Sequence, residues 1–210
     1  VPNRPAIVAQ QAEDAIKHVD DVLDRPISFH YMDHGVYLKR RNRSEADYIA
    51  QLVRSLLNQP RKISIGIVAF SEAQQKEIEM ALQRLAQEDA DFMEALETEY
   101  EREEDGEFVG LLVKNLENIQ GDERDLVIMS VCYGYNEEGR MFMNFGPINK
   151  SGGEKRLNVA FSRAKHHMAL VSSIRDYDIT NDYNHGANCL KNYIRYASAV
   201  SEGNIPAVQN

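Results

Sequence analysis

The chain has 210 residues, 43% hydrophobic and 27% charged, which is enough for one substantial core and favours a single α/β domain. It contains no run of about 18 apolar residues, and residues 1–10 lack the charged and apolar regions of a secretion signal. We therefore expect a cytoplasmic protein with no membrane partner. Two cysteines, Cys132 and Cys189, are too few for a disulfide scaffold and form no CxxC pair for zinc.

The net charge of −9 comes from one segment. Residues 88–107 hold 11 acidic residues and one base, a net of −10, so the other 190 residues carry +1. Met93 and Leu96 in this segment favour a solvated helix or a lid. Two basic clusters, residues 39–43 and 150–175, have the charge that phosphate binding requires. For residues 39–43, ordinary solvated surface charge remains the alternative.

Hydrophobic periodicity predicts alternating helices and strands. We expect helices at residues 12–23, 44–57, 71–87, 153–164 and 187–199. We expect buried strands at residues 27–32, 63–70, 108–113, 126–133 and 167–173. Ser44 and Ser71 are the expected N-caps of the second and third helices, and Gln74 occupies the capping-box position after Ser71. The βαβ alternation predicts a mostly parallel central sheet with helices on both faces.

Ligands of open parallel sheets bind past the carboxyl ends of the strands. The loops that begin there are expected at residues 70–71, 114–120, 134–152 and 172–173. Neither GxxxxGK[ST] nor GxGxxG occurs in the chain. Asp122 and Glu123 precede an apolar run, whereas a magnesium-binding acidic pair of the Walker B kind ends one. These features argue against a complete nucleotide hydrolase.

Two polar segments contain residues suited to contact a ligand. Residues 120–125 read QGDERD, in which Gly121 allows close approach of the backbone to a ligand. Residues 152–165 read GGEKRLNVAFSRAK, with Arg156 and Arg163 seven residues apart on one face of the expected helix. Arginine is suited to bidentate contact with phosphate oxygens. The alternative is an amphipathic helix with surface arginines.

Together these segments resemble the superfamily 1 helicases, in particular the Upf1-like branch. Residues 120–125 resemble motif V, and RLNVAFSRAK resembles motif VI. IGIVAFSEAQQ is similar to motif IV, and RRNRSEADYIAQLV resembles the segment upstream of it. The resemblance covers residues 27–175 and implies the second RecA-like domain of a two-domain motor, with residues 1–210 as one domain and residues 88–107 as an acidic helical insertion. The linker from motif V to motif VI is similar to bacterial multidomain members, which favours DNA over RNA.

The resemblance also implies roles for single residues. Arg163 matches the arginine that reaches the γ-phosphate, and Glu123 matches the acid at the ribose of the nucleotide. Gln120 and Gly121 match the turn that couples nucleotide to the bound strand. The residues implied to bind nucleotide are Arg163, Glu123, Gln120, Gly121, Arg156 and Lys165.

Ser71 and Gln74 fall in motif IV, where nucleic-acid or nucleotide contacts are expected, although Ser71 is equally a good N-cap. We assign both residues to nucleic-acid binding. The implied cofactors are ATP and Mg²⁺, with the Mg²⁺ ligands on a first RecA-like domain elsewhere in the polypeptide. We expect ATP between that domain and the carboxyl edge of this sheet, and negligible ATPase activity in the isolated chain. The alternative is a RecA-like module that binds nucleic acid or protein without hydrolysis, with the acidic segment as its docking surface.

Overall fold

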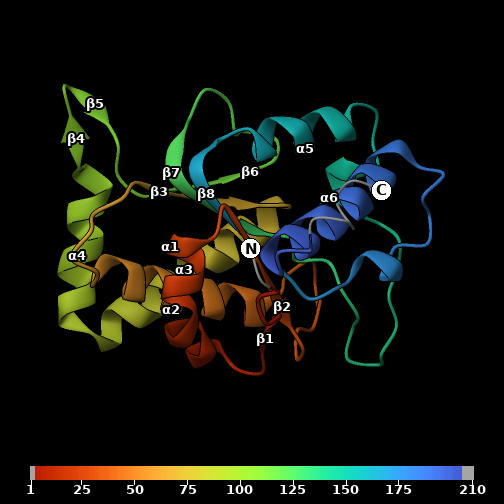
Figure 1. The fold of residues 1–210 in the computed structure, drawn as a ribbon, viewed down its shortest axis with the longest axis horizontal. Coiled ribbons are helices and arrows are strands. Elements are labelled where there is room, and N and C mark those ends of the chain that lie inside the picture. Colours follow the sequence, from red (N-terminus) through yellow and green to blue (C-terminus); the bar gives the residue numbers. More distant parts are fainter. Residues whose placement is uncertain (1–2, 205–210) are drawn as a thin grey trace.

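A six-stranded parallel sheet forms the centre of the molecule in the computed structural model, which describes residues 3–204. The strand order is β1-β2-β8-β7-β3-β6, and every neighbouring pair is parallel (Figure 1). The strands are β1 (Ile7–Ala9), β2 (Ile27–Met32), β3 (Ile65–Ala69), β6 (Leu112–Asn115), β7 (Arg124–Ser130) and β8 (Ala164–Ser172). The predicted α/β fold with a mostly parallel central sheet is confirmed.

Helices cover both faces of this sheet (Figure 1). One face packs on η1 (Ala12–His18), α1 (Val19–Asp24), α2 (Arg43–Leu57), α3 (Glu72–Glu88) and α4 (Ala90–Glu101). The other packs on η2 (Gly146–Ile148), α5 (Gly153–Phe161) and α6 (His185–Ser201), and η3 (Asp176–Asp178) precedes α6. Within β3, Ile67 belongs to the first core and Val68 to the second. A central strand covered on both faces has to be apolar at successive positions, which explains its β-branched run.

Helix starts depend on contacts that the local sequence only partly indicates. Ser71 is the N-cap of α3, and its hydroxyl accepts a hydrogen bond from the Gln74 N–H at 3.1 Å. The predicted N-cap Ser44 is wrong: α2 begins one residue earlier, and the Asn42 side chain accepts from the Glu45 N–H at 3.0 Å. Asn42 has extended backbone angles (φ −128°, ψ 93°) and is buried, so tertiary contacts favour it as the cap.

The acidic segment forms more than a helix. Beyond α4, β4 (Glu103–Glu104) and β5 (Glu107–Phe108) pair as an antiparallel hairpin at the far left of Figure 1. Asp105 and Gly106, with φ of 53° and 80°, turn the chain between them. The strand expected over residues 108–113 is therefore divided, and only the part from Leu112 onward joins the central sheet as β6.

Candidate functional site

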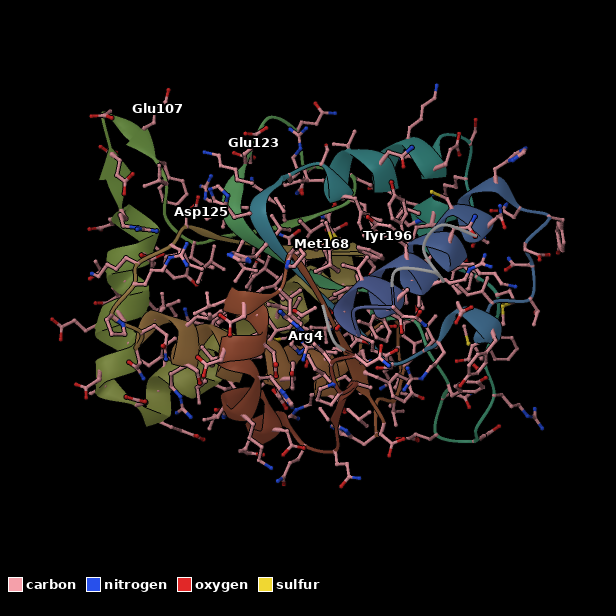
Figure 2. All side chains as sticks on the ribbon, in the orientation of Figure 1. Arg4, Glu107, Glu123, Asp125, Met168 and Tyr196 are labelled. Carbon is pink, nitrogen blue, oxygen red and sulfur yellow. The ribbon has the colours of Figure 1, made fainter. Side chains whose placement is uncertain are left out.

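The two segments that resemble motifs V and VI meet at one edge of the sheet. Glu123 directly precedes β7, and Arg163 directly precedes β8. The Arg124 N–H donates to the carbonyl oxygen of Arg163 at 3.2 Å, which joins the two segments. Because a residue before a parallel strand lies at the amino edge, the expectation that these residues face a ligand at the carboxyl edge is wrong. In Figure 2, Glu123 and Glu107 of the hairpin both lie at the upper margin of the molecule.

The Arg163 guanidinium lies at the surface, beside the end of α5. Its Nε donates to the Val159 carbonyl at 3.1 Å and its Nη2 to the Ser162 Oγ at 3.0 Å. Both acceptors are neutral and partly solvated, so the guanidinium retains unused donors for an anion. Lys165 and Glu123 are exposed at the same edge. Arg163 and Lys165 thus lie at this edge together with Glu123 and the partly exposed Asp122 and Asp125.

Arg156 does not join this group. Its Nη1 donates to the carbonyls of Pro147 and Ser151 at 3.3 and 3.2 Å, at the opposite end of α5. The helix ends at Phe161, so Arg163 lies outside it. The expectation that the two arginines share one helical face is wrong, because a seven-residue spacing aligns side chains only while the helix continues. Arg156 instead fastens the turn that leads into α5.

The turn at Gln120 and Gly121 is exposed. Gly121 has φ of 74°, and an added Cβ would meet nothing within 4 Å. The glycine is therefore favoured by a left-handed backbone and not by close packing. Its position leaves the turn open on the surface between β6 and β7.

Arg124 organises the amino edge, and the sequence pattern did not single it out. It is 5% exposed, and its Nε donates to the Gly110 carbonyl at 2.9 Å and its Nη1 to the Glu123 carbonyl at 2.8 Å. Its guanidinium also lies over the Phe108 ring, 5.3 Å from the centroid. Burial lowers the pKa of Arg124. This side chain ties the segment around Glu123 to the hairpin of the acidic insertion.

The carboxyl edge carries a groove of about 830 Å³. Its walls come from the loops after β3, β6 and β7 and from the segment before α2, as expected for a parallel sheet. It is lined by four bases and two acids, together with aromatic and polar side chains: Arg40, Arg41, Lys76, Lys150, Glu72, Glu117, Tyr37, Phe142, Ser71 and Asn115. Phe142 is 71% exposed. Arg40 and Arg41 belong to the basic run of the sequence, and the Arg41 guanidinium is paired with the carboxylate of the buried Glu77 at 3.3 Å.

The two residues expected to contact nucleic acid have different positions at this edge. Ser71 lines the groove while its hydroxyl caps α3. Gln74 has no exposed surface: its Oε1 accepts from the Asn42 N–H at 2.8 Å, and its Nε2 donates to the Asn42 carbonyl at 2.9 Å. The assignment of Gln74 as a direct contact is therefore wrong for this conformation, because its amide is used within the protein. It attaches α3 to the start of α2.

A buried carboxylate lies beneath the groove. Glu45 is fully buried, and burial raises its pKa to about 7 although the hydroxyls of Ser173 and Ser130 and the backbone of Cys132 act in the opposite direction.

Within residues 3–204 no three His, Cys, Asp or Glu side chains are grouped so that they could hold a metal ion. Over the same residues, no helix combines the length and apolarity needed to cross a membrane.

The fold and the two edges define the class of the protein. A six-stranded parallel sheet between two helical layers is the α/β arrangement of RecA-like domains. A family model described as "AAA domain" matches residues 11–175. The chain belongs to this AAA domain family.

Two relatives from mycoplasmas match most of the chain. The uncharacterized ATP-dependent helicase MG140 of Mycoplasma genitalium is 35% identical over 195 residues, 91% of this chain. Its homolog in Mycoplasma pneumoniae is 35% identical over 197 residues, 90% of this chain. In both cases the chain spans 16% of the length of the relative.

Proposed function

We propose that this chain is the second motor domain of an ATP-dependent helicase or translocase that acts on DNA. The observation that carries the proposal is the backbone bond from Arg124 to Arg163, which joins the two motif-like segments at one edge of the sheet. The names of the two mycoplasma relatives support a helicase-type motor. Their much greater length leaves room for a first motor domain in the same polypeptide.

Nucleotide is proposed to bind at the amino edge, between this chain and the first domain. Arg163 would place positive charge on the γ-phosphate, where charge develops during phosphoryl transfer. Glu123 would accept hydrogen bonds from the ribose hydroxyls, and Lys165 would add a second positive charge at the rim. Bound ATP with Mg²⁺ supplies the scissile phosphoanhydride, and the residues holding the metal are assigned to the first domain.

Nucleic acid is proposed to bind in the groove at the carboxyl edge. Arg40, Arg41, Lys76 and Lys150 match the repeating negative charge of a phosphate backbone. Phe142 is exposed and offers a ring on which a base of a single strand can stack. The sheet thus separates the two ligands, and β7 runs from the nucleotide edge to the groove.

The test is the Arg163→Ala variant of the full-length protein, assayed for DNA-stimulated ATP turnover. Loss of an arginine that contacts the transferred phosphoryl group lowers turnover by a factor of about 10³ to 10⁵. Circular dichroism and thermal unfolding should match the wild type, because Arg163 makes only surface hydrogen bonds. The matched control is Arg195→Ala, which removes an exposed arginine of α6. Turnover near the wild-type rate in Arg163→Ala would refute the assignment.

A further inference from the structure

The Glu45 carboxylate connects three chain segments beneath the groove. Its Oε1 accepts from the Ser130 hydroxyl at 2.8 Å and from the Cys132 N–H at 2.9 Å. Its Oε2 accepts from the Ser173 hydroxyl at 2.7 Å and from the Asn42 Nδ2 at 3.0 Å. The four donors come from the start of α2, the end of β7 and the end of β8. A fully buried carboxylate needs such donors, and satisfying them fixes the three segments relative to one another.

Asn42 extends this network to the walls of the groove. Its Nδ2 also donates to the Cys132 carbonyl at 3.0 Å, and its backbone forms the two bonds with Gln74. Asn42 directly follows Arg40 and Arg41, which line the groove. Gln74 lies on α3, and the N-cap of that helix, Ser71, lines the groove. The network therefore reaches the basic wall and the α3 wall together.

Two stretches that lead into this groove have a backbone that L-residues rarely adopt. Cys132 has φ of 66°, and Lys39 and Arg40 have φ of 53° and 65°. Left-handed angles at residues other than glycine persist where the surrounding structure holds them. The Cys132 N–H is held by Glu45, and the carbonyl of Cys132 by Asn42.

The residue after Cys132 forms the floor of the groove. Tyr133 is 2% exposed and lines the groove, and its hydroxyl donates to the Phe70 carbonyl at 2.9 Å. The direction in which Tyr133 leaves β7 depends on the backbone of Cys132. Releasing the Cys132 N–H would therefore shift the floor, together with the basic wall that Asn42 holds.

We propose that Glu45 is a positioning residue, which holds the basic wall, the floor and the α3 wall of the groove at the spacing that a single nucleic-acid strand requires. The proposal rests on the proposed function, because it takes the groove to be the nucleic-acid site. Glu45 itself touches no ligand. It acts through Asn42 and Cys132.

The experiment uses Glu45→Gln in the full-length protein. Glutamine has nearly the same shape but replaces one acceptor oxygen by an NH₂ group, which faces donors and cannot accept from them. We expect the dissociation constant for a fluorescently labelled single-stranded DNA, measured by anisotropy, to rise about tenfold, equivalent to 1.4 kcal/mol. The DNA concentration for half-maximal ATP turnover should rise equally, with the maximal rate changed less than about twofold.

The matched control is Tyr48→Phe on the same helix. Tyr48 is buried, and its hydroxyl is bonded to His30 and not to the groove network. This variant should lose stability and keep the wild-type affinity for DNA. Equal loss of affinity in Tyr48→Phe and Glu45→Gln would overturn the proposal, because general loosening of α2 would then explain both.

Three other outcomes are distinguishable. Wild-type affinity in folded Glu45→Gln would overturn the positioning role and leave the proposed function intact. No DNA binding by the wild-type protein would overturn the proposed nucleic-acid site, and the inference with it. If Glu45→Gln does not fold, Ser173→Ala decides, since it leaves the carboxylate in place and removes only the Ser173 hydroxyl, which donates to Glu45 at 2.7 Å and accepts from Asn42 Nδ2 at 2.8 Å. An affinity about threefold lower supports the proposal, and an unchanged affinity overturns it.

Discussion

The two edges of the sheet hold their candidate functional side chains in different ways. At the amino edge, Arg163 and Glu123 lie on short connections, and a single backbone bond between neighbouring strands brings them together. At the carboxyl edge the groove is assembled from loops far apart in the sequence, over a layer of buried polar groups that includes Glu45 and Gln74. Strand pairing, reinforced by the buried Arg124 side chain, positions the first set. The second set is held by a larger network of side-chain hydrogen bonds across elements.

The comparison predicts that a substitution at one edge leaves ligand binding at the other edge unchanged. The largest effect is expected from a substitution of Arg124. The Arg124→Gln variant removes a buried guanidinium that bonds to the carbonyls of Gly110 and Glu123. Loss of these charge-assisted bonds should lower the free energy of unfolding by about 3 kcal/mol, measured by urea denaturation. In the full-length protein the KM for ATP should rise, because Glu123 loses its support, while the affinity for single-stranded DNA stays at the wild-type value.

The control for this variant is Arg61→Gln, which changes an exposed arginine before β3. It should leave stability and both ligand affinities unchanged. A parallel loss of ATP and DNA affinity in Arg124→Gln would break the comparison, because the two edges would then respond as one unit.

A second prediction concerns the sheet between the edges. Burial lowers the pKa of His30 to about 3, against an ordinary value near 6.5, while its ring nitrogens are bonded to Tyr48 and Ser28. The folded state keeps this imidazole neutral, and the unfolded chain protonates it below about pH 6.5. Stability should therefore fall as the pH falls from about 6.5 toward 3, with about 2 kcal/mol lost by about pH 5 through this residue.

The measurement is urea denaturation at several pH values between about 5 and 7. His30→Gln should lose less stability over this range than the wild type, because glutamine does not titrate. His185→Gln serves as the control, since it replaces an exposed histidine at the start of α6. Identical pH dependence in the wild type and His30→Gln would contradict the prediction.

The elements of the central sheet were more predictable than its edges. The apolar run that contains β3 predicts a buried strand, because both faces of that strand are covered. The hairpin was missed since Phe108 and Val109 extend the apolar pattern of β6, although the Asp105-Gly106 pair is a turn signal. The start of α2 was misplaced because the contacts that favour Asn42 over Ser44 come from Gln74 and Cys132, which are remote in sequence.

The residues of the candidate sites were likewise only partly predictable from the sequence. The segments around Glu123 and Arg163 were identifiable because a contiguous pattern carries each one, but which residues share a face depended on where α5 ends. The groove had only a partial signal, the basic clusters at residues 39–43 and 150–175, which contain Arg40, Arg41 and Lys150. Lys76 has no basic neighbours that mark it, and only folding brings it together with the others. Gln74 looked like a ligand contact because its sequence position does not reveal its burial.

The smallest expected effect comes from single bases of the groove. Lys150→Ala in the full-length protein removes an exposed cation that lines the groove, while the backbone bonds of Lys150 to Pro147 and Gly153 remain. We expect the affinity for single-stranded DNA to fall about threefold to tenfold, and the slope of log affinity against log salt to decrease in magnitude by about 0.7. The KM for ATP should not change. The control is Lys62→Ala, which removes an exposed lysine beyond the opposite end of β3. It should alter neither the affinity for DNA nor the salt slope. An unchanged salt slope in Lys150→Ala would show that this lysine meets no phosphate, and the path of the strand would then have to follow the Arg40 and Lys76 side of the groove.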